Sequence, residues 1–449
     1  MSVLNRKESL ILLFGDILLL LAALWVMLML RYGTILDKRI FYMHLVPFSV
    51  LFLVWLFVFF IAGLYEKQTL LRRGRLPRIL LRAIITNSFI GILFFYFIPY
   101  FGIAPKINLF LYLIISFCFI LSWRMYGYRL LHVKKKQNAI IIGTGAELSE
   151  LALEVNQNAR YHIRFIESVE ADELDAERFK DNVLGRIEAE HVTLVALDFQ
   201  NKKIETILPY LYDLIFRNVE FIDIHGLYEE IFDRVPLSLL KYSWFLEHVT
   251  VTPSAGYDAL KRMMDVVLSA LLGFLSLMFY PFIIVAIKLD DGGPVFISQE
   301  RVGLHGVTIR TVKFRTMTRD DAGVVRIQKN NRPTRVGPFL RKTRLDELPQ
   351  FWNIFRGDLS LIGPRPELPS LVSVYEREVP YYNTRHLIKP GLSGWAQLYH
   401  DNHPHHRADV EETRVKLSYD LYYIKNRSFF LDLKISLKTL KTLLSRSGR

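Results

Sequence analysis

The chain has 449 residues, of which 51% are hydrophobic and 13% aromatic, and its formal net charge is +13 at pH 7. That length allows two or three domains, and the charge excludes a purely apolar integral protein while fitting contact with anionic lipids or phosphorylated substrates. The only cysteine, Cys118, lies in an apolar run, which excludes a disulfide framework and a zinc site built from cysteine.

Four apolar runs approach or exceed the length that spans a bilayer, near 9–30, 42–63, 79–101 and 107–124. Basic residues are dense in loop 65–78 and just after the fourth run, whereas loop 99–106 has only Lys106. The positive-inside rule therefore predicts a four-helix transmembrane bundle over 1–137 with both ends in the cytoplasm. Basic residues gathered beside apolar segments also favour a membrane over nucleic acid as the anionic partner. Asp16 interrupts the first run, and we expect it to make a packed polar contact inside the bundle.

Residues 138–255 change character, because short apolar runs alternate there with helical stretches. This alternation is typical of a doubly wound, Rossmann-like α/β domain. A buried strand ends in Gly143-Thr144-Gly145, but Leu148 stands where a dinucleotide-binding turn has its third glycine. The domain either binds a nucleotide weakly or keeps the fold without the ligand. The incomplete turn favours the second interpretation, with a regulatory or dimerising role.

A fifth apolar run covers about 262–288 and is broken past its middle by Pro281. As a straight span it would place the polar segment that follows on the outer side of the membrane, away from nucleotide donors. A re-entrant membrane helix that turns back at Tyr280-Pro281 keeps both flanks cytoplasmic. Proline suits such a bend because it removes one helical hydrogen bond. An ordinary fifth span is the alternative.

Two adjacent carboxylates, Asp346 and Glu347, follow the basic segment 341–344 beyond this run. Acids supply a nucleophile, a base or a metal ligand while cations hold anionic oxygens, so the cluster fits chemistry on a phosphate. Pro349 predicts that a helix begins near Asp346, which places this carboxylate at the N-cap beside free backbone N–H groups. The alternative is that Asp346 only caps the helix and Glu347 is solvated.

Four further motifs surround the acid pair: Gln299-Glu-Arg301-Val-Gly303, Lys313-Phe-Arg315-Thr-Met317, Gly357-Asp-Leu-Ser-Leu-Ile-Gly-Pro-Arg365-Pro366 and Lys389-Pro-Gly-Leu-Ser-Gly-Trp-Ala-Gln397. With these motifs, residues 256–445 closely resemble the bacterial sugar transferase family, the monotopic phosphoglycosyl transferases that start glycan assembly on undecaprenyl phosphate. The added bundle and α/β domain resemble the large membrane-bound branch of O-antigen, capsule and exopolysaccharide pathways. The resemblance implies a mainly α, monotopic catalytic domain over 256–449.

The resemblance also implies a two-step transfer. Asp346 matches the family nucleophile, which attacks the sugar-bearing phosphate of a UDP-sugar, expels UMP and carries the phosphosugar until undecaprenyl phosphate accepts it. Glu347 matches its partner, which binds Mg²⁺ or assists proton transfer, so Mg²⁺ held by the two acids is the expected cofactor. Charge neutralisation at the diphosphate is expected from Mg²⁺ and from the basic residues Lys313, Arg315, Arg341, Arg365 and Arg301.

The chain departs from the family pattern in two places. The family breaks its re-entrant helix at a Ser-Pro pair, where this chain has Tyr280-Pro281, so the serine hydrogen bonds at the break are not carried over. Beyond Gln397 the chain lacks the arginine of the common family pattern, which leaves the sugar open. The histidines that follow predict a polar loop rather than a metal site: His403, His405 and His406. Residues 429–444 predict a basic amphipathic helix on the cytoplasmic leaflet, or else a packed surface helix.

Other functions stay open at this point: a glycosyltransferase that releases UDP, a non-catalytic membrane scaffold or regulator of polysaccharide assembly, and a dinucleotide-dependent enzyme centred on Gly143 and Gly145. We expect a multi-pass protein of the bacterial inner membrane with its middle and catalytic domains in the cytoplasm. The expected partners are the UDP-sugar, undecaprenyl phosphate, membrane lipid and a second copy in a homodimer, without nucleic acid.

Overall fold

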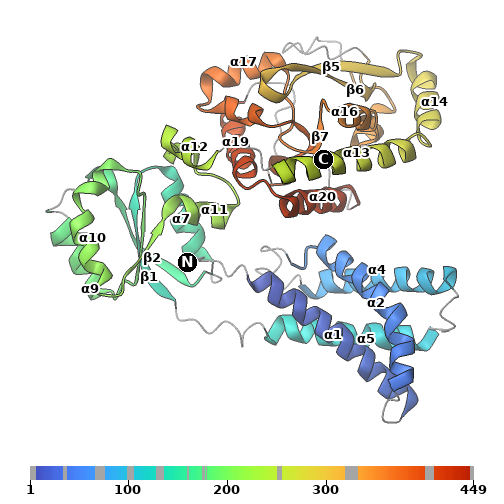
Figure 1. Ribbon diagram of the computed structural model, residues 1–449, viewed down its shortest axis with the longest axis horizontal. Helices are drawn as coiled ribbons and strands as arrows, with labels where there is room; N and C mark the ends of the chain where they lie inside the picture. Colours follow the sequence, from blue (N-terminus) through green and yellow to red (C-terminus); the bar gives the residue numbers. More distant parts are fainter. Residues whose placement is uncertain are drawn as a thin grey trace.

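The computed structural model describes residues 7–33, 38–65, 76–98, 106–127, 136–158, 161–173, 177, 179–249, 255–318, 332–399 and 409–444. They form a bundle of apolar helices, a parallel α/β domain and a mixed α/β C-terminal domain (Figure 1). Most basic residues of loop 65–78, loop 99–105 and the three clustered histidines at 403–406 lie outside the described residues.

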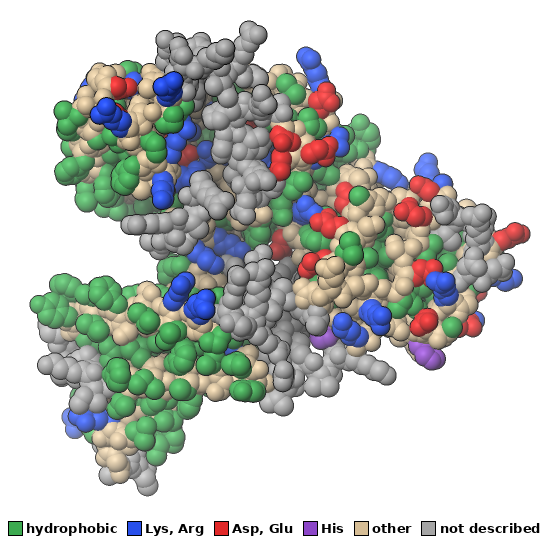
Figure 2. All heavy atoms as spheres, turned by 180° about the vertical axis from the view of Figure 1, so that it is seen from behind, with side chains coloured by type: hydrophobic (Ala, Val, Ile, Leu, Met, Phe, Trp, Pro, Cys, Tyr) green, Lys and Arg blue, Asp and Glu red, His purple; other side chains and the backbone are tan. Residues whose placement is uncertain are grey.

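The N-terminal bundle consists of α1 (Lys7–Tyr32), α2 (Lys38–Ile61), α4 (Leu76–Phe97) and α5 (Lys106–Ser122), followed by a π-helical turn over Trp123–Gly127. All four helices are long and apolar enough to cross a membrane, as the apolar runs predict. Large apolar side chains are exposed along them, and Figure 2 shows hydrophobic groups covering most of the bundle's visible face. A surface of this kind is stable in lipid rather than in water.

The packed polar contact expected of Asp16 is confirmed. Its carboxylate is fully buried and accepts hydrogen bonds from the Tyr65 hydroxyl at 2.8 Å and from the Arg124 guanidinium. Arg124 also donates to the carbonyl oxygen of Leu64 at 2.6 Å. The pair therefore joins α1 to the ends of α2 and α5, and neither charge faces the exposed apolar surface.

The middle domain is built on a four-stranded parallel sheet in the order β2-β1-β3-β4. Its strands are β1 (Gln137–Gly143), β2 (Ile163–Glu170), β3 (Leu194–Leu197) and β4 (Glu220–Asp223). One face packs against α7 (Ala146–Gln157) and α11 (Ile224–Phe232), and the other packs against α9 (Gly185–Ala189) and α10 (Leu208–Ile215). Helices on both faces bury the central strands, β3 throughout and β1 over its last five residues, which explains their short continuous apolar runs.

The C-terminal domain combines helices with two small sheets. Its helices are α13 (Ala255–Ser276), α14 (Tyr280–Asp291), α15 (Gly337–Lys342), α16 (Gln350–Arg356), α17 (Pro369–Glu378), α18 (Trp395–Tyr399), α19 (Val410–Lys425) and α20 (Phe429–Leu444). An antiparallel hairpin joins β5 (Phe296–Val302) to β6 (Thr308–Phe314), and β7 (Ser360–Ile362) pairs in parallel with β8 (Gly391–Ser393). The domain is therefore mixed α/β rather than mainly α. The β-branched residues Thr308, Ile309, Thr311 and Val312 make β6 favour a strand over a helix.

Helices α13 and α14 meet at a bend of 57°. The bend lies just before Pro281, which occupies the first turn of α14, where a proline costs no helical hydrogen bond. The Ser276 hydroxyl donates to the Gly273 carbonyl oxygen at 2.6 Å and is buried beside the bend. A serine four residues before the Tyr-Pro pair thus supplies a local hydrogen bond that the family's Ser-Pro pattern does not predict.

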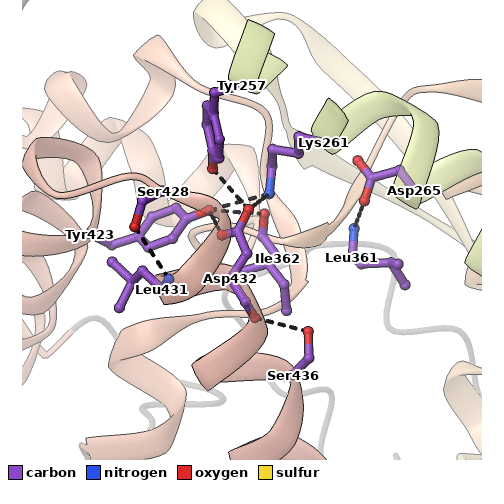
Figure 3. A network of polar contacts seen from close by, with 10 residues as sticks. All are labelled: Tyr257, Lys261, Asp265, Leu361, Ile362, Tyr423, Ser428, Leu431, Asp432 and Ser436. Atoms are coloured by element: carbon purple, nitrogen blue, oxygen red, sulfur yellow. Dashed lines mark hydrogen bonds and ion pairs between the residues drawn. The ribbon is translucent and has the colours of Figure 1, made fainter. Parts of the chain in front are cut away.

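Polar contacts fix one side of α13 to the rest of its domain (Figure 3). Asp432 of α20 accepts hydrogen bonds from Tyr257 at 2.8 Å, Lys261 at 2.9 Å and Tyr423 at 2.7 Å. One turn further along α13, the Asp265 carboxylate accepts the Leu361 backbone N–H at 2.9 Å. The opposite side of α13 is apolar and exposed, with Met263, Val267, Leu271 and Phe274 all more than half exposed.

Residues 233–249, which follow α11 and include α12 (Tyr242–His248), connect the middle domain to the C-terminal domain by packing into it. The Trp395 indole donates to the Asp233 carbonyl oxygen at 2.8 Å, and the Val235 N–H donates to the Ser418 carbonyl oxygen at 3.1 Å. Trp244 of α12 is fully buried in the same apolar core. The segment upstream of α13 therefore completes the core of the C-terminal domain.

Strands β7 and β8 approach so closely that glycine is required between them. A Cβ atom on Gly391 would lie 2.1 Å from the backbone nitrogen of Gly363. The Gly363 N–H donates to the Ser393 carbonyl oxygen at 2.9 Å, and the Gly391 N–H donates to the Pro364 carbonyl oxygen at 2.9 Å. These contacts hold the Gly363-Pro364-Arg365 turn, which accounts for glycines in both motifs.

Replacing Gly391 by Ala is expected to lower stability by ~1–3 kcal/mol, because a backbone atom rather than a flexible side chain blocks the added methyl group. Gly185→Ala is the matched control, since a Cβ atom there meets nothing within 4 Å and its φ is not positive. Thermal unfolding of the full chain in detergent would show a lower Tm for Gly391→Ala only. Equal Tm values for the two variants would contradict the close approach.

Candidate functional site

The acid pair lies in a 3₁₀ turn, Leu345–Glu347, between α15 and α16. Arg344 adopts a left-handed conformation with φ of 57°, which reverses the chain after α15 and turns both acids inward. Asp346 and Glu347 are both buried. The prediction that a helix begins near Asp346 is wrong by about one turn: Pro349 is itself the N-cap of α16, and the α-helix begins at Gln350. Asp346 is therefore not a helix cap, because it precedes α16 by a full turn.

Glu347 is the centre of an ion cluster. Its Oε1 atom lies 3.0 Å from an Arg365 guanidinium nitrogen and 3.8 Å from the Lys313 amine, and its Oε2 atom lies 3.5 Å from Arg344. Burial alone would raise the pKa of Glu347, but Arg365, Lys313 and Arg344 lower it to about 2. Glu347 is thus a fixed negative charge at any pH near neutrality.

Asp346 has the opposite character. Its Oδ1 atom is buried and has no hydrogen-bond partner within the described part of the chain. Burial and the neighbouring charge of Glu347 raise the pKa of Asp346 to about 6, while Lys313, Arg341 and Arg344 act in the other direction. A buried polar atom without a partner is costly, and such atoms are common where a substrate or ion completes the site.

Four of the basic residues in the motifs lie on the acid-pair side of the domain or support residues that do, and the fifth, Arg315, does not. Lys313 of β6 and Arg365 contact Glu347, while Arg301 of β5 donates to the Pro366 carbonyl oxygen at 3.2 Å and thereby supports the Arg365 turn. Arg341 donates to the Thr316 hydroxyl at 2.9 Å and is exposed. Burial lowers the pKa of Lys313 to about 8 even though Glu347 opposes this. Lys313, Arg365 and Arg341 therefore act directly on the acid pair, whereas Arg301 acts on it through the Arg365 turn.

Arg315 is not brought to the acid pair. Its guanidinium pairs with Asp291 at the end of α14 and packs against Gly293. Residues two apart in a strand point to the same face, so the strand pattern alone would place Arg315 beside Lys313. Arg315 lies just past the last residue of β6, Phe314, where this rule no longer applies. Arg315 therefore fastens the end of β6 to the C-terminal end of α14.

Sequence reasoning missed a layer of buried charges behind Arg365. The Arg385 guanidinium donates to the Arg365 carbonyl oxygen at 2.9 Å and pairs with Asp420 at 2.9 Å. Beside it, Lys416 of α19 pairs with Glu367, whose pKa burial would raise but Lys416 and Arg385 lower to about 2. Of these four residues only Glu367 borders a motif, so no local pattern in the sequence marks the layer.

The acid pair is the expected metal site. Within the described residues, no three His, Cys, Asp or Glu side chains are grouped so that they could hold an ion. Mg²⁺ commonly uses one or two protein carboxylates and takes its other ligands from phosphates and water. The unpartnered oxygen of Asp346 fits such a role, whereas both oxygens of Glu347 already face cations.

Comparison with known proteins gives a consistent result for the C-terminal domain. Residues 256–446 match the family described as bacterial sugar transferase. The chain is 43% identical over 205 residues to a UDP-N-acetylgalactosamine-undecaprenyl-phosphate N-acetylgalactosaminephosphotransferase of Aeromonas hydrophila, covering 44% of this chain and 47% of that protein. It is 41% identical over 179 residues to a UDP-glucose:undecaprenyl-phosphate glucose-1-phosphate transferase of Klebsiella pneumoniae, covering 39% and 38%.

A shorter relative is matched almost completely. The uncharacterized sugar transferase EpsL of Bacillus subtilis is 39% identical over 191 residues, which cover 42% of this chain and 89% of that protein. In contrast, the chain aligns with less than half of the length of the Aeromonas and Klebsiella proteins. The family match over residues 256–446 includes the acid pair.

The two carboxyl groups are expected to titrate far apart. Because the raised pKa of Asp346 is about 6, half of this group should be protonated near pH 6, while Glu347 should stay ionised to about pH 2. Carboxyl ¹³C NMR of aspartate-labelled protein can follow Asp346, and Asp346→Asn identifies its signal by loss. A signal that titrates near the ordinary value of 3.8 would contradict the burial argument.

Proposed function

The chain belongs to the bacterial sugar transferase family, and we propose that it transfers a sugar 1-phosphate from a UDP-sugar to undecaprenyl phosphate with release of UMP. The names of its relatives support the donor and acceptor classes, since they act on UDP-sugars and undecaprenyl phosphate. The observation that carries the proposal is the buried, unpartnered Oδ1 atom of Asp346 among Lys313, Arg341 and Arg344. Transfer of this kind is the first membrane step of bacterial glycan synthesis.

We propose that the reaction has two displacement steps at one phosphorus atom. In the first, an Asp346 carboxylate oxygen forms a bond to the phosphorus that bears the sugar, and the bond from this phosphorus to the bridging oxygen breaks. UMP leaves with the electron pair. In the second, a phosphate oxygen of undecaprenyl phosphate bonds to the same phosphorus, and the acyl phosphate bond breaks. The carboxylate of Asp346 is regenerated, and the lipid carries a diphosphate sugar.

Cations around the acid pair would reduce the repulsion between a carboxylate and a diphosphate, because Lys313 and Arg341 lie close enough to Asp346 to lower its pKa. Glu347 holds Lys313, Arg344 and Arg365 in place. A carboxyl group with a pKa of about 2 is a poor proton carrier at neutral pH, so we assign Glu347 an electrostatic and orienting role rather than proton transfer.

Mg²⁺ is the cofactor that this arrangement suits. Asp346 Oδ1 would hold it together with donor phosphate oxygens and water, and when bound it would supply charge neutralisation at the diphosphate. Arg365 and Lys313 would remain bound to Glu347 and keep its carboxylate oriented.

We propose that α13 and α14 form a re-entrant membrane helix in the bacterial inner membrane, with both arms returning to the cytoplasmic side. Three observations support this topology: the bend of 57°, the exposed apolar side of α13, and the exposed Phe282, Val285 and Leu289 on α14. Figure 2 shows hydrophobic side chains gathered at the end of the domain where α14 lies. The domain would then lie on the membrane rather than beyond it.

For the middle domain we propose a Rossmann-like fold with a regulatory or dimerising role. Its glycine turn begins α7 at Gly145, with φ of 111°. The Glu147 carboxylate in the first turn of α7 accepts the Ser238 N–H at 3.0 Å and also the Ser238 hydroxyl. A carboxylate and a covering segment at this position would oppose a dinucleotide phosphate.

Asp346→Asn is expected to slow UMP release by a factor on the order of 10³ or more, because an amide cannot form the acyl phosphate. With a donor carrying ³²P in the phosphate next to the sugar, wild-type protein should retain label and Asp346→Asn should not. The exposed Asp172→Asn in the middle domain is the control for general effects of an aspartate change. Release of UDP would favour an ordinary glycosyltransferase, and full turnover by a folded Asp346→Asn protein would rule out the covalent route.

Cysteine labelling tests the topology. In a Cys118→Ser background, cysteines replacing the exposed Val307 and Leu440 should resist a membrane-impermeant maleimide in intact cells and react after lysis. A cysteine at position 102, in the loop expected on the outer side, is the positive control. Reaction at either 307 or 440 before lysis would establish a straight fifth span instead.

A further inference from the structure

Asn353 of α16 is buried and bonds with its side-chain amide to the backbone of β6. Its Oδ1 atom accepts the Val312 N–H at 3.1 Å, and its Nδ2 atom donates to the Arg310 carbonyl oxygen at 2.7 Å. Nδ2 also donates to Asp358 at 3.1 Å. Both the oxygen and the nitrogen of the amide are thus hydrogen-bonded within the chain.

These contacts complete one edge of β6. In an antiparallel pair, alternate residues turn their N–H and C=O groups toward the partner, and the residues between them turn these groups outward. Strand β5 is the partner on one side, and the outward groups of Arg310 and Val312 meet the amide of Asn353. The side chain therefore stands in for a second neighbouring strand.

The position of this amide links two parts of the site. Lys313 directly follows Val312, and its amine lies 3.8 Å from Glu347 Oε1. Glu347 lies six residues before Asn353, in the turn that leads into α16. The Asn353 backbone oxygen in turn accepts N–H groups of Gly357 and Asp358, both at 3.0 Å, so the residue is held on the α16 side as well.

We infer that Asn353 is a positioning residue for sugar-phosphate transfer: it fixes the strand that carries Lys313 against the segment that carries Asp346 and Glu347. This inference rests on the proposed function. Lys313 has a flexible side chain, so its amine can stay near the acid pair only if the backbone of β6 is held in register. A shift of this backbone by about 1 Å is enough to cost a reaction on the order of 100-fold.

The chain contains a matched control in the middle domain. Asn156 of α7 makes the same kind of contact with the edge of β2: its Nδ2 atom donates to the Phe165 carbonyl oxygen at 2.8 Å, and its Oδ1 atom accepts the Phe165 N–H at 2.9 Å. The two asparagines share helix-to-strand pairing, but only Asn353 holds the strand that carries Lys313. Asn156→Leu therefore reproduces the loss of the contact without the loss of positioning.

The test is a double-mutant cycle in the full chain. Asn353→Leu removes the amide at nearly constant volume, and Lys313→Met removes the amine. Single-turnover transfer of ³²P-labelled phosphosugar to the protein is measured for wild type, each variant and the pair, per folded molecule. Asn353→Leu should slow transfer roughly 10- to 100-fold in the wild-type background. In the Lys313→Met background it should slow transfer less than about threefold, because the positioned group is already gone.

Asn156→Leu should leave the transfer rate per folded molecule unchanged in both backgrounds. If Asn353→Leu folds poorly, Asn353→Gln can replace it, because it keeps the amide but displaces it by one methylene. Asn353→Gln should also slow transfer more in the wild-type background than in the Lys313→Met background. Acetylation of Lys313, read by mass spectrometry, should be faster in either Asn353 variant than in wild type.

Equal losses from Asn353→Leu in the two backgrounds, or unchanged Lys313 acetylation, would show that Asn353 only stabilises the fold. Wild-type protein that takes up no label would overturn the proposed function and this inference together. Labelled wild type with an additive cycle would overturn the positioning role alone.

Discussion

One buried carboxylate, that of Glu347, holds the site together. Its three cations come from separate parts of the chain: Lys313 from β6, Arg344 from the turn before the acid pair, and Arg365 from the turn after β7. A buried charge without partners is strongly destabilising. Replacing any one of these residues by a neutral one would therefore leave the remaining buried charges unbalanced and lower the stability of the domain. Arg365 is held beside this carboxylate by its own backbone turn. That turn is fixed by the close contact of Gly363 with Gly391 and by hydrogen bonds from Arg385 and Arg301.

The same cluster separates the roles of two adjacent acids. The nearest cations bond to Glu347 and lower its pKa, and its retained negative charge helps to raise the pKa of Asp346. Asp346 is left with a buried oxygen that has no partner in the described residues. Opposite pKa shifts in neighbouring carboxyl groups commonly mark distinct chemical tasks. On the proposed function, Glu347 is the fixed charge that orders the cations, and Asp346 is the group that reacts.

Helices and strands that follow from local sequence patterns were predicted correctly. Side-chain partners that depend on residues distant in the chain were not. Apolar length located the four helices of the bundle, and alternating runs predicted the parallel sheet of the middle domain. Motif residues Lys313 and Arg365 do meet Glu347, but Arg315 pairs with Asp291 instead, since its direction depends on where β6 ends. The start of α16 was misplaced because a left-handed Arg344 and a 3₁₀ turn intervene. Asn353 carries no signal of its own, because its partners are backbone groups 41 and 43 residues away.

On the proposed topology, helix α16 would link the acid pair to the membrane surface. Trp352 and Phe355 stack at 5.7 Å on its exposed side, while Asn353 between them faces β6. The Arg262 guanidinium of α13 donates to the carbonyl oxygens of Ile354 and Phe355, both at 2.9 Å, which ties this helix to the bent pair. Exposed aromatic side chains next to a membrane helix favour the interface between headgroups and acyl chains. On the proposed function and topology, Asp346 lies one turn before α16, so the depth at which these rings settle would also set the depth of this carboxylate. The phosphate of a lipid acceptor would lie at the same level and could reach the site without leaving the membrane.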